Sequence, residues 1–95
     1  MKLVIKPSTK SNKKYMAIFT DKDGGKTTTH FGAKGSSTYI DHKDDKKKQA
    51  YLDRHKVNEN WNNYKSAGSL SRYILWNKKT LSASIDDFKK RFKLK

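Results

Sequence analysis

Hydrophobic and polar residues alternate with a period of two in the first third of the chain, a pattern typical of β-strands with one buried face. The segments with this pattern are rich in β-branched and aromatic residues and comprise residues 2–6, 14–20 and 26–31. Paired glycines in the segment 21–25 predict a hairpin turn, because such turns need positive φ angles. A second turn is expected over 32–37, followed by a short fourth strand over 38–40.

The pattern changes to a helical period from residue 41 onward. Asp41 or Asp44 is expected to cap a helix over 46–56. Its narrow apolar stripe contains Leu52, His55 and the aliphatic stem of Lys48, and it is flanked by Tyr51. A polar break over 58–63 surrounds Trp61.

Two further helices are expected. One begins near Ser66 or Ser69 and places Leu70, Tyr73, Ile74 and Asn77 on one face. The last begins at Ser82 or Ser84, where Ser84 and Asp87 have the spacing of a capping box. Its apolar stripe has clean helical spacing and consists of Leu81, Ile85, Phe88 and Phe92.

Strands followed by helices predict an α+β fold. We expect an antiparallel sheet of three or four strands from residues 2–40, packed with two or three helices from 41–93. The length of 95 residues fits one domain, residues 1–95, with one modest core. Trp61 and Trp76 are expected to close this core; exposed rings would instead stack on unpaired bases.

The net charge of the chain indicates more about its function than any motif does. The chain has 23 Lys and Arg against 9 Asp and Glu, a formal net charge of +14, which exceeds what solubility requires. Only Arg54, Arg72 and Arg91 are arginines. Lysine suits phosphate as a point charge, whereas guanine edges are more often read by arginine, so the composition favours binding to a phosphate backbone.

The basic residues fall into three clusters, in the segments 10–14, 46–56 and 78–95. Within a small domain these clusters produce one shared positive field. The candidate nucleic-acid-binding residues are Lys13, Lys14, His30, Lys34, Lys46, Lys47, Lys48, Arg54, Lys56, Arg72, Lys78, Lys79, Lys89, Lys90, Arg91 and Lys93. Arg54 and Arg72 are the candidates for reading bases; for Arg72, which lies beside Tyr73, a structural pair is the alternative.

Other chemistry has little support in the sequence. There is no cysteine, and the three histidines lack metal-ligand spacing, so no metal, cofactor or enzymatic activity is expected. The segment Gly32 to Gly35 has the GxxG form of some nucleic-acid modules, but it follows a strand and is also explained as an ordinary turn. His30 and Phe31 are adjacent in a strand, so their side chains point to opposite faces of the sheet. His30 is therefore expected to be exposed if Phe31 is buried. No apolar run is long enough to span a membrane.

Several blocks resemble a family of small basic proteins of unassigned function from nucleocytoplasmic large DNA viruses of the chlorovirus, mimivirus and marseillevirus types. The resemblance runs from about Leu3 to Phe92 and is most specific at Gly68 to Lys78. It also includes the blocks 2–6, 14–17, 30–35, 54–56 and 59–61. It implies a viral protein, located in the virion or in the host cytoplasm or nucleus, and it supplies no catalytic residues.

We therefore expect a non-enzymatic, largely sequence-independent DNA-binding protein that packages or condenses a viral genome. The expected partner is duplex DNA, bound through lysine–phosphate contacts with counterion release. The alternative is a structural virion or adaptor protein that binds an acidic protein partner. A second copy of the chain and another virion protein both remain open as further partners, and no membrane partner is expected.

Overall fold

The computed structural model describes residues 1–56 and 61–95. Three strands, β1 (Lys2–Pro7), β2 (Lys13–Thr20) and β3 (Lys26–Ala33), form an antiparallel sheet in the order β1-β2-β3. The helical elements that follow are α1 (Tyr39–His42), α2 (Asp45–His55), α3 (Ala67–Leu70), the π-helix η1 (Ser71–Leu75) and α4 (Leu81–Arg91). The predicted α+β class is therefore confirmed. The expected polar break over 58–63 includes residues 57–60, which lie outside the described part.

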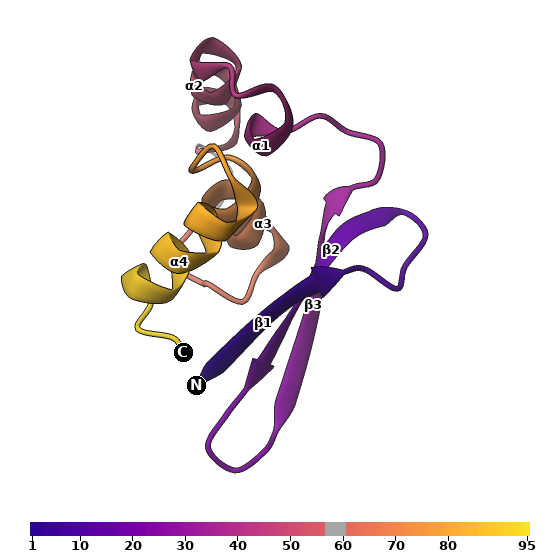
Figure 1. Ribbon diagram of the computed structural model, residues 1–95, viewed down its shortest axis with the longest axis vertical. Helices are drawn as coiled ribbons and strands as arrows, with labels where there is room; N and C mark the ends of the chain where they lie inside the picture. The colour runs from indigo at the N-terminus through magenta and orange to yellow at the C-terminus, as the bar shows by residue number, and fades with distance from the viewer. Residues whose placement is uncertain (57–60) are drawn as a thin grey trace.

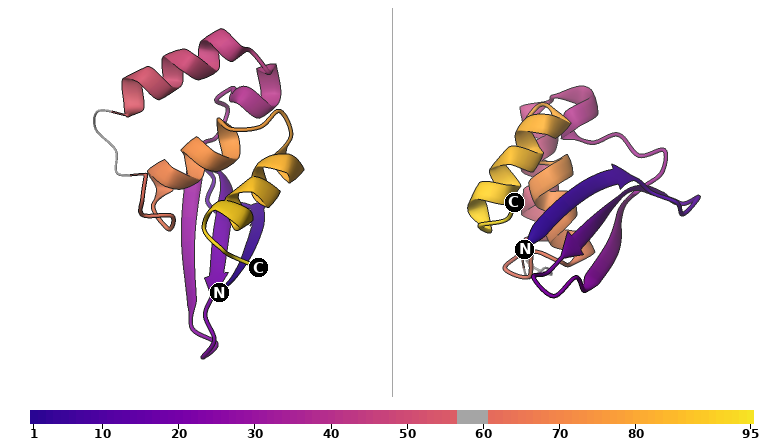
Figure 2. Two further views of the ribbon diagram at one scale, coloured as in Figure 1. Left: turned by 90° about the vertical axis from the view of Figure 1, so that its left-hand side faces the viewer. Right: turned by 60° about the horizontal axis from the view of Figure 1, so that its bottom comes forward.

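Alternation along the strands separates the two faces of the sheet. Leu3 pairs with Phe19 and Tyr15 pairs with Phe31, and these residues point toward the helices. Their neighbours in sequence, such as Lys2 and Val4, are exposed on the other face. The helices lie against one face only and leave the other uncovered, as the right-hand view of Figure 2 shows.

The core lies between the inner sheet face and the helices α3, η1 and α4. It is built from large side chains, as expected for a chain with few apolar residues. Its buried members are Leu3, Ala17, Phe19, Phe31, Leu70, Ile74, Leu75, Phe88 and Leu94. The predicted stripe of the last helix is confirmed, because Phe88 is fully buried and Leu81, Ile85 and Phe92 pack against the core.

The chain ends meet at β1 (Figure 1). The Leu3 N–H donates to the Lys95 carbonyl at 2.8 Å, and the Lys95 N–H donates to the Met1 carbonyl at 3.0 Å. These bonds occupy backbone groups at the start of edge strand β1 that would otherwise be open to another strand.

Three details of the sequence prediction are wrong. Residues 38–40 form no strand: Thr38 caps α1 in a capping box with Asp41, whose carboxylate accepts the Thr38 N–H at 2.7 Å. The last helix begins at Leu81, where the Thr80 hydroxyl accepts the Ala83 N–H, and Ser84 is buried within it. In α2, Tyr51 is the buried residue, whereas Leu52 and His55 are half-buried.

Other helix starts were predicted correctly. Asp44 caps α2 by accepting the N–H groups of Lys46 and Lys47. Ser66 caps α3 by accepting the N–H of Ser69. Asp41 therefore serves α1, and Asp44 alone serves the longer helix.

Helix α2 extends beyond the end of the sheet rather than over its face, at the top of Figure 1. It is joined to the core by an aromatic stack between Tyr51 and Trp76, with ring centroids 4.3 Å apart and planes within 3°. Trp76 is presented by the end of η1, where its N–H donates to the Ser71 carbonyl five residues earlier at 3.1 Å. His55 stacks on the Tyr51 ring at 4.2 Å.

Gly32 and Gly35 both have positive φ, at 79° and 87°, but only Gly32 is tightly packed. A Cβ on Gly32 would lie 2.8 Å from Leu75 Cδ1 and 3.2 Å from Lys14 Cβ, whereas none of the described atoms would lie within 4 Å of a Cβ on Gly35.

Replacing either residue by Ala should cost about 1–2 kcal/mol through backbone strain alone. We expect Gly32→Ala to lose clearly more stability than Gly35→Ala in urea unfolding, and equal losses would show that β3 and η1 do not approach this closely.

Candidate nucleic-acid interface

Most basic side chains of α2 face solvent, and one of them points toward the protein interior. Lys46 and Lys47 are exposed in the first turn, and Arg54 is exposed near the end of the helix. Lys56 follows the helix, with its Nζ 3.9 Å from an oxygen of Asp53, and both side chains are more than half exposed. Surface pairs of this kind contribute little to stability, so these cations remain available to a phosphate ligand.

Lys48 differs from its two neighbours because it points toward the protein. Its Nζ donates to the Asn77 carbonyl at 2.8 Å and lies 4.8 Å from the centre of the Tyr39 ring. Burial lowers the pKa of Lys48, and the positive charge of Arg72 lowers it further, although the carboxylate of Asp45 opposes the shift. Lys78 adds a weaker repulsion in the same direction. Lys48 is therefore used to attach α2, close to other cations.

Asn77 extends this attachment to α4. Its side-chain Nδ2 donates to Asp87 at 2.7 Å, and the same carboxylate oxygen lies 3.4 Å from an Arg91 nitrogen. Burial raises the pKa of Asp87, but the hydrogen bond from Asn77 and the charge of Arg91 outweigh it and hold that pKa below the usual value. The next residue, Lys78, donates its backbone N–H to the Ser84 hydroxyl at 3.0 Å.

Arg72 has an internal role in the structure. Its guanidinium donates to the Trp76 carbonyl at 3.1 Å, and its central carbon lies 5.4 Å from the Trp61 ring centre and 4.9 Å from that of Tyr73. Burial lowers the pKa of this guanidinium, which nevertheless stays charged at neutral pH. This geometry matches the structural pair foreseen for Arg72 rather than a role in reading guanine.

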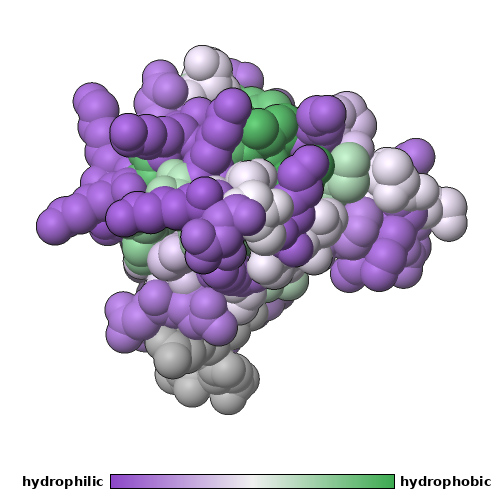
Figure 3. Space-filling model, turned by 90° about the horizontal axis from the view of Figure 1, so that it is seen from below, coloured by the Kyte–Doolittle hydropathy of each residue, from purple (hydrophilic) through white to green (hydrophobic). Residues whose placement is uncertain are grey.

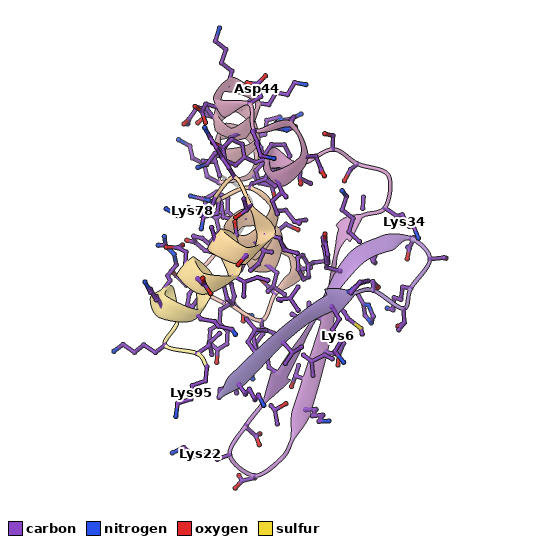
Figure 4. All side chains as sticks on the ribbon, viewed as in Figure 1. Lys6, Lys22, Lys34, Asp44, Lys78 and Lys95 are labelled. Carbon is purple, nitrogen blue, oxygen red and sulfur yellow. The ribbon has the colours of Figure 1, made fainter. Side chains whose placement is uncertain are left out.

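These contacts bring two of the three predicted clusters together. Lys48, Asn77 and Asp87 connect the start of α2, the turn after η1 and the middle of α4. We define the helical basic surface as the exposed lysines beside this connection, namely Lys46, Lys47, Lys78, Lys79 and Lys90. The half-buried Lys89 of α4 and the exposed Lys93, which follows the end of that helix, extend it. Figure 4 shows Lys78 on the side of the molecule formed by the helices.

Part of the remaining predicted cluster lies at the opposite side. Two of its three lysines, Lys13 and Lys14, line a notch between the β1–β2 loop and the turn after β3 together with Lys34, and Figure 4 shows Lys34 far from Lys78. His30 is half-buried although Phe31 is fully buried, and its Nδ1 lies 2.7 Å from the Ser8 hydroxyl. In the GxxG turn, the Lys34 N–H donates to Asn12 and the Ser36 N–H donates to Ala33, so these two amides are already bonded within the protein.

The uncovered sheet face carries three lysines that we did not predict as candidates. Lys2, Lys6 and Lys26 surround Val4 and Ile18 there. The alternation of Lys2, Val4 and Lys6 along one strand was a usable signal, since residues two apart share a face. Seen from below, the molecule is mostly hydrophilic, and hydrophobic surface is confined to small patches (Figure 3).

Every aromatic side chain in the described part of the chain is buried or half-buried. Trp76 packs against the core, as expected, but the same expectation is not confirmed for Trp61, which is half-buried beside Arg72. A pocket of about 410 Å³ opens between α2, α3 and the segment 33–38, and its lining includes Tyr51, His55 and Trp76. Tyr51 uses its ring faces for stacking on Trp76 and His55. This arrangement favours contacts to phosphate over stacking on unpaired bases.

Within the described residues 1–56 and 61–95, no group of three or more His, Asp or Glu side chains could hold a metal ion. Over the same ranges, no helix combines the length and apolar character needed to cross a membrane.

Lys47 and Lys48 provide a matched test of these assignments. Lys48→Met should lower the free energy of unfolding by about 1–2 kcal/mol, because it removes the ammonium group and leaves the Asn77 carbonyl without its hydrogen-bond donor. Lys47→Met should change it by less than about 0.5 kcal/mol, as is usual at an exposed site. Thermal or urea unfolding measures both, and equal effects would contradict an internal role for Lys48.

Comparison with known proteins gives one match. Residues 3–55, from β1 to the end of α2, match a family of unknown function, DUF5754. The comparisons with curated proteins and with solved structures gave no match. The matched segment covers more than half of the 95-residue chain, so the chain belongs to the family DUF5754.

Proposed function

We propose that this protein binds duplex DNA through lysine–phosphate contacts, without enzymatic activity and with little dependence on sequence. The observation that carries the proposal is the helical basic surface, in which exposed lysines from two segments distant in sequence, 46–47 and 78–90, flank one connected junction. Burial is the main cause that lowers the pKa of Lys48, and the nearby charges of Arg72 and Lys78 act in the same direction against that of Asp45, which shows that cations gather at this junction.

The choice of residues supports binding to the backbone rather than base reading. Of the three arginines, Arg72 is bonded internally and Arg91 is paired with Asp87. Arg54 is the exposed arginine without a carboxylate partner among the described residues. Apart from Arg54 and Arg91, the exposed cationic side chains of the described residues are lysines, and lysine binds phosphate as a point charge without the bidentate geometry that selects guanine.

Packaging or condensation of a viral genome is the setting we propose for this binding. It rests on the resemblance to small basic proteins of large DNA viruses and on the net charge of +14. We therefore propose that the protein is located in the virion and in the host cytoplasm or nucleus.

A second candidate function is binding to an acidic protein, as a virion component or adaptor. The uncovered sheet face favours it, because Val4 is 37% exposed and is surrounded by Lys2, Lys6 and Lys26. Capture of an acidic partner that survives nuclease treatment would support this candidate over DNA binding.

The first test of DNA binding is its dependence on salt. If about 5–8 phosphates are neutralised, a plot of log K against log[salt] for a random duplex should have a slope of about −4.5 to −7. Electrophoretic shift across a salt series measures this slope. A slope near zero would contradict binding by counterion release.

Two variants with equal loss of charge locate the surface. Replacing Lys46, Lys47, Lys78 and Lys79 by Ala should weaken binding to all duplexes alike and flatten the slope by about one unit for each lysine that contacts phosphate. The control replaces Lys2, Lys6, Lys22 and Lys26, which lie on the uncovered face and the hairpin, and should have a clearly smaller effect. The reverse order would move the DNA-binding site to the sheet.

Selection from randomised duplex DNA tests sequence dependence. We expect preferences of no more than about threefold, because lysine–phosphate contacts carry no base information. A sharp consensus sequence would contradict a packaging role and indicate a regulator.

A further inference from the structure

The notch on the side away from the helical basic surface has its own set of cations. It has a volume of about 360 Å³ and lies between the β1–β2 loop and the turn that follows β3. Three of the residues that line it are lysines, Lys13, Lys14 and Lys34, and its walls include Ser8 and Gly35.

A backbone hydrogen bond joins the two loops, since the Lys34 N–H donates to the Asn12 carbonyl at 3.1 Å. Within the β1–β2 hairpin, the Ser8 N–H donates to the Lys14 carbonyl at 3.1 Å. The turn itself is closed by the Ser36 N–H on Ala33, with Gly35 at a φ of 87°. The lysines therefore extend from a fixed frame, so less conformational freedom is lost when they bind a ligand.

The positive charge of the notch is only partly balanced. Lys14 Nζ lies 3.3 Å from Asp41 Oδ2, and only 19% of the Lys14 side chain is exposed. Among the residues that the structure describes, Lys13 and Lys34 have no carboxylate partner, and Lys34 is exposed. The three lysines that line the notch are thus balanced by a single carboxylate, and the excess positive charge suits a phosphate group.

The Ser8 side chain is fixed beside these lysines. Its hydroxyl oxygen accepts the Lys10 N–H at 3.0 Å and is hydrogen-bonded to His30 Nδ1, 2.7 Å away. The wall of the notch therefore includes a bonded polar group beside its lysines, and this favours an ionic ligand.

The notch and the helical basic surface lie on opposite sides of the molecule, as the positions of Lys34 and Lys78 in Figure 4 show. The molecule is 42 Å along its longest axis and 25 Å along its shortest. One duplex lying on the helices would leave the notch open to a different duplex.

We propose that the three-lysine notch is a second phosphate-binding site and that one protein molecule thereby holds two DNA duplexes together. This inference rests on the proposed function, since the first duplex occupies the helical basic surface. It gives the protein a way to condense DNA as a monomer, by bridging neighbouring duplexes in addition to neutralising them.

Pairing of two duplexes tests the inference. Two short duplexes of unrelated sequence carry a donor and an acceptor dye, and energy transfer between them is measured as protein is added. Wild-type protein should bring the duplexes together. The variant Lys13→Ala/Lys34→Ala should reduce pairing by about tenfold while keeping most of its affinity for one duplex, because only the second contact is lost. Lys22→Ala/Lys26→Ala loses the same charge at the hairpin and should pair duplexes as the wild type does.

Four results would overturn the inference, and they are distinguishable. Failure of the wild type to shift a single duplex would overturn the proposed function and bridging together. Normal single-duplex binding without pairing would overturn bridging alone, as would pairing that persists in Lys13→Ala/Lys34→Ala. A dimer of the free protein in light scattering would attribute pairing to two copies and overturn the monomeric bridge. Circular dichroism checks that each variant is folded.

Discussion

The stack of Tyr51 on Trp76 is the contact on which the arrangement of charge depends. Helix α2 carries exposed lysines yet lies beyond the end of the sheet, with Tyr51 as its buried residue. The stack joins that residue to the end of η1, and Lys48 adds a hydrogen bond to Asn77 beside it. Aromatic pairs of this kind contribute more than their buried area alone. Without this contact, α2 and α4 would present two separate basic segments.

The fold accommodates a net charge of +14 by giving its cations different roles. Lys14, Lys48, Arg72 and Arg91 contact a carboxylate, a carbonyl or an aromatic ring, so their charge contributes to packing. The exposed lysines keep their hydration, and their mutual repulsion opposes folding. A polyanion would relieve this repulsion, so ligand binding and stability should be coupled.

The sequence predicted the elements well where the pattern is local. Alternation located the three strands, and helical spacing identified Phe88 as buried. Residues 38–40 were misread because Thr, Tyr and Ile are typical of strands, although Thr38 and Asp41 already had the spacing of a capping box. The identity of the candidate lysines was also visible. The sequence could not show which of these lysines face solvent and which are bonded inside the protein, because the bond from Lys48 to Asn77 joins residues 29 apart in sequence.

The most direct test of this account is a nuclear magnetic resonance titration of the protein with a short random duplex. We expect the first equivalent of DNA to shift the amide signals of residues 46–47, 78–79 and 89–93. We expect the signals of Lys13 and Lys34 to shift when a second duplex is added in excess. Shifts confined to Lys2, Lys6 and Lys26 on the uncovered sheet face, or no shifts at low salt, would contradict it.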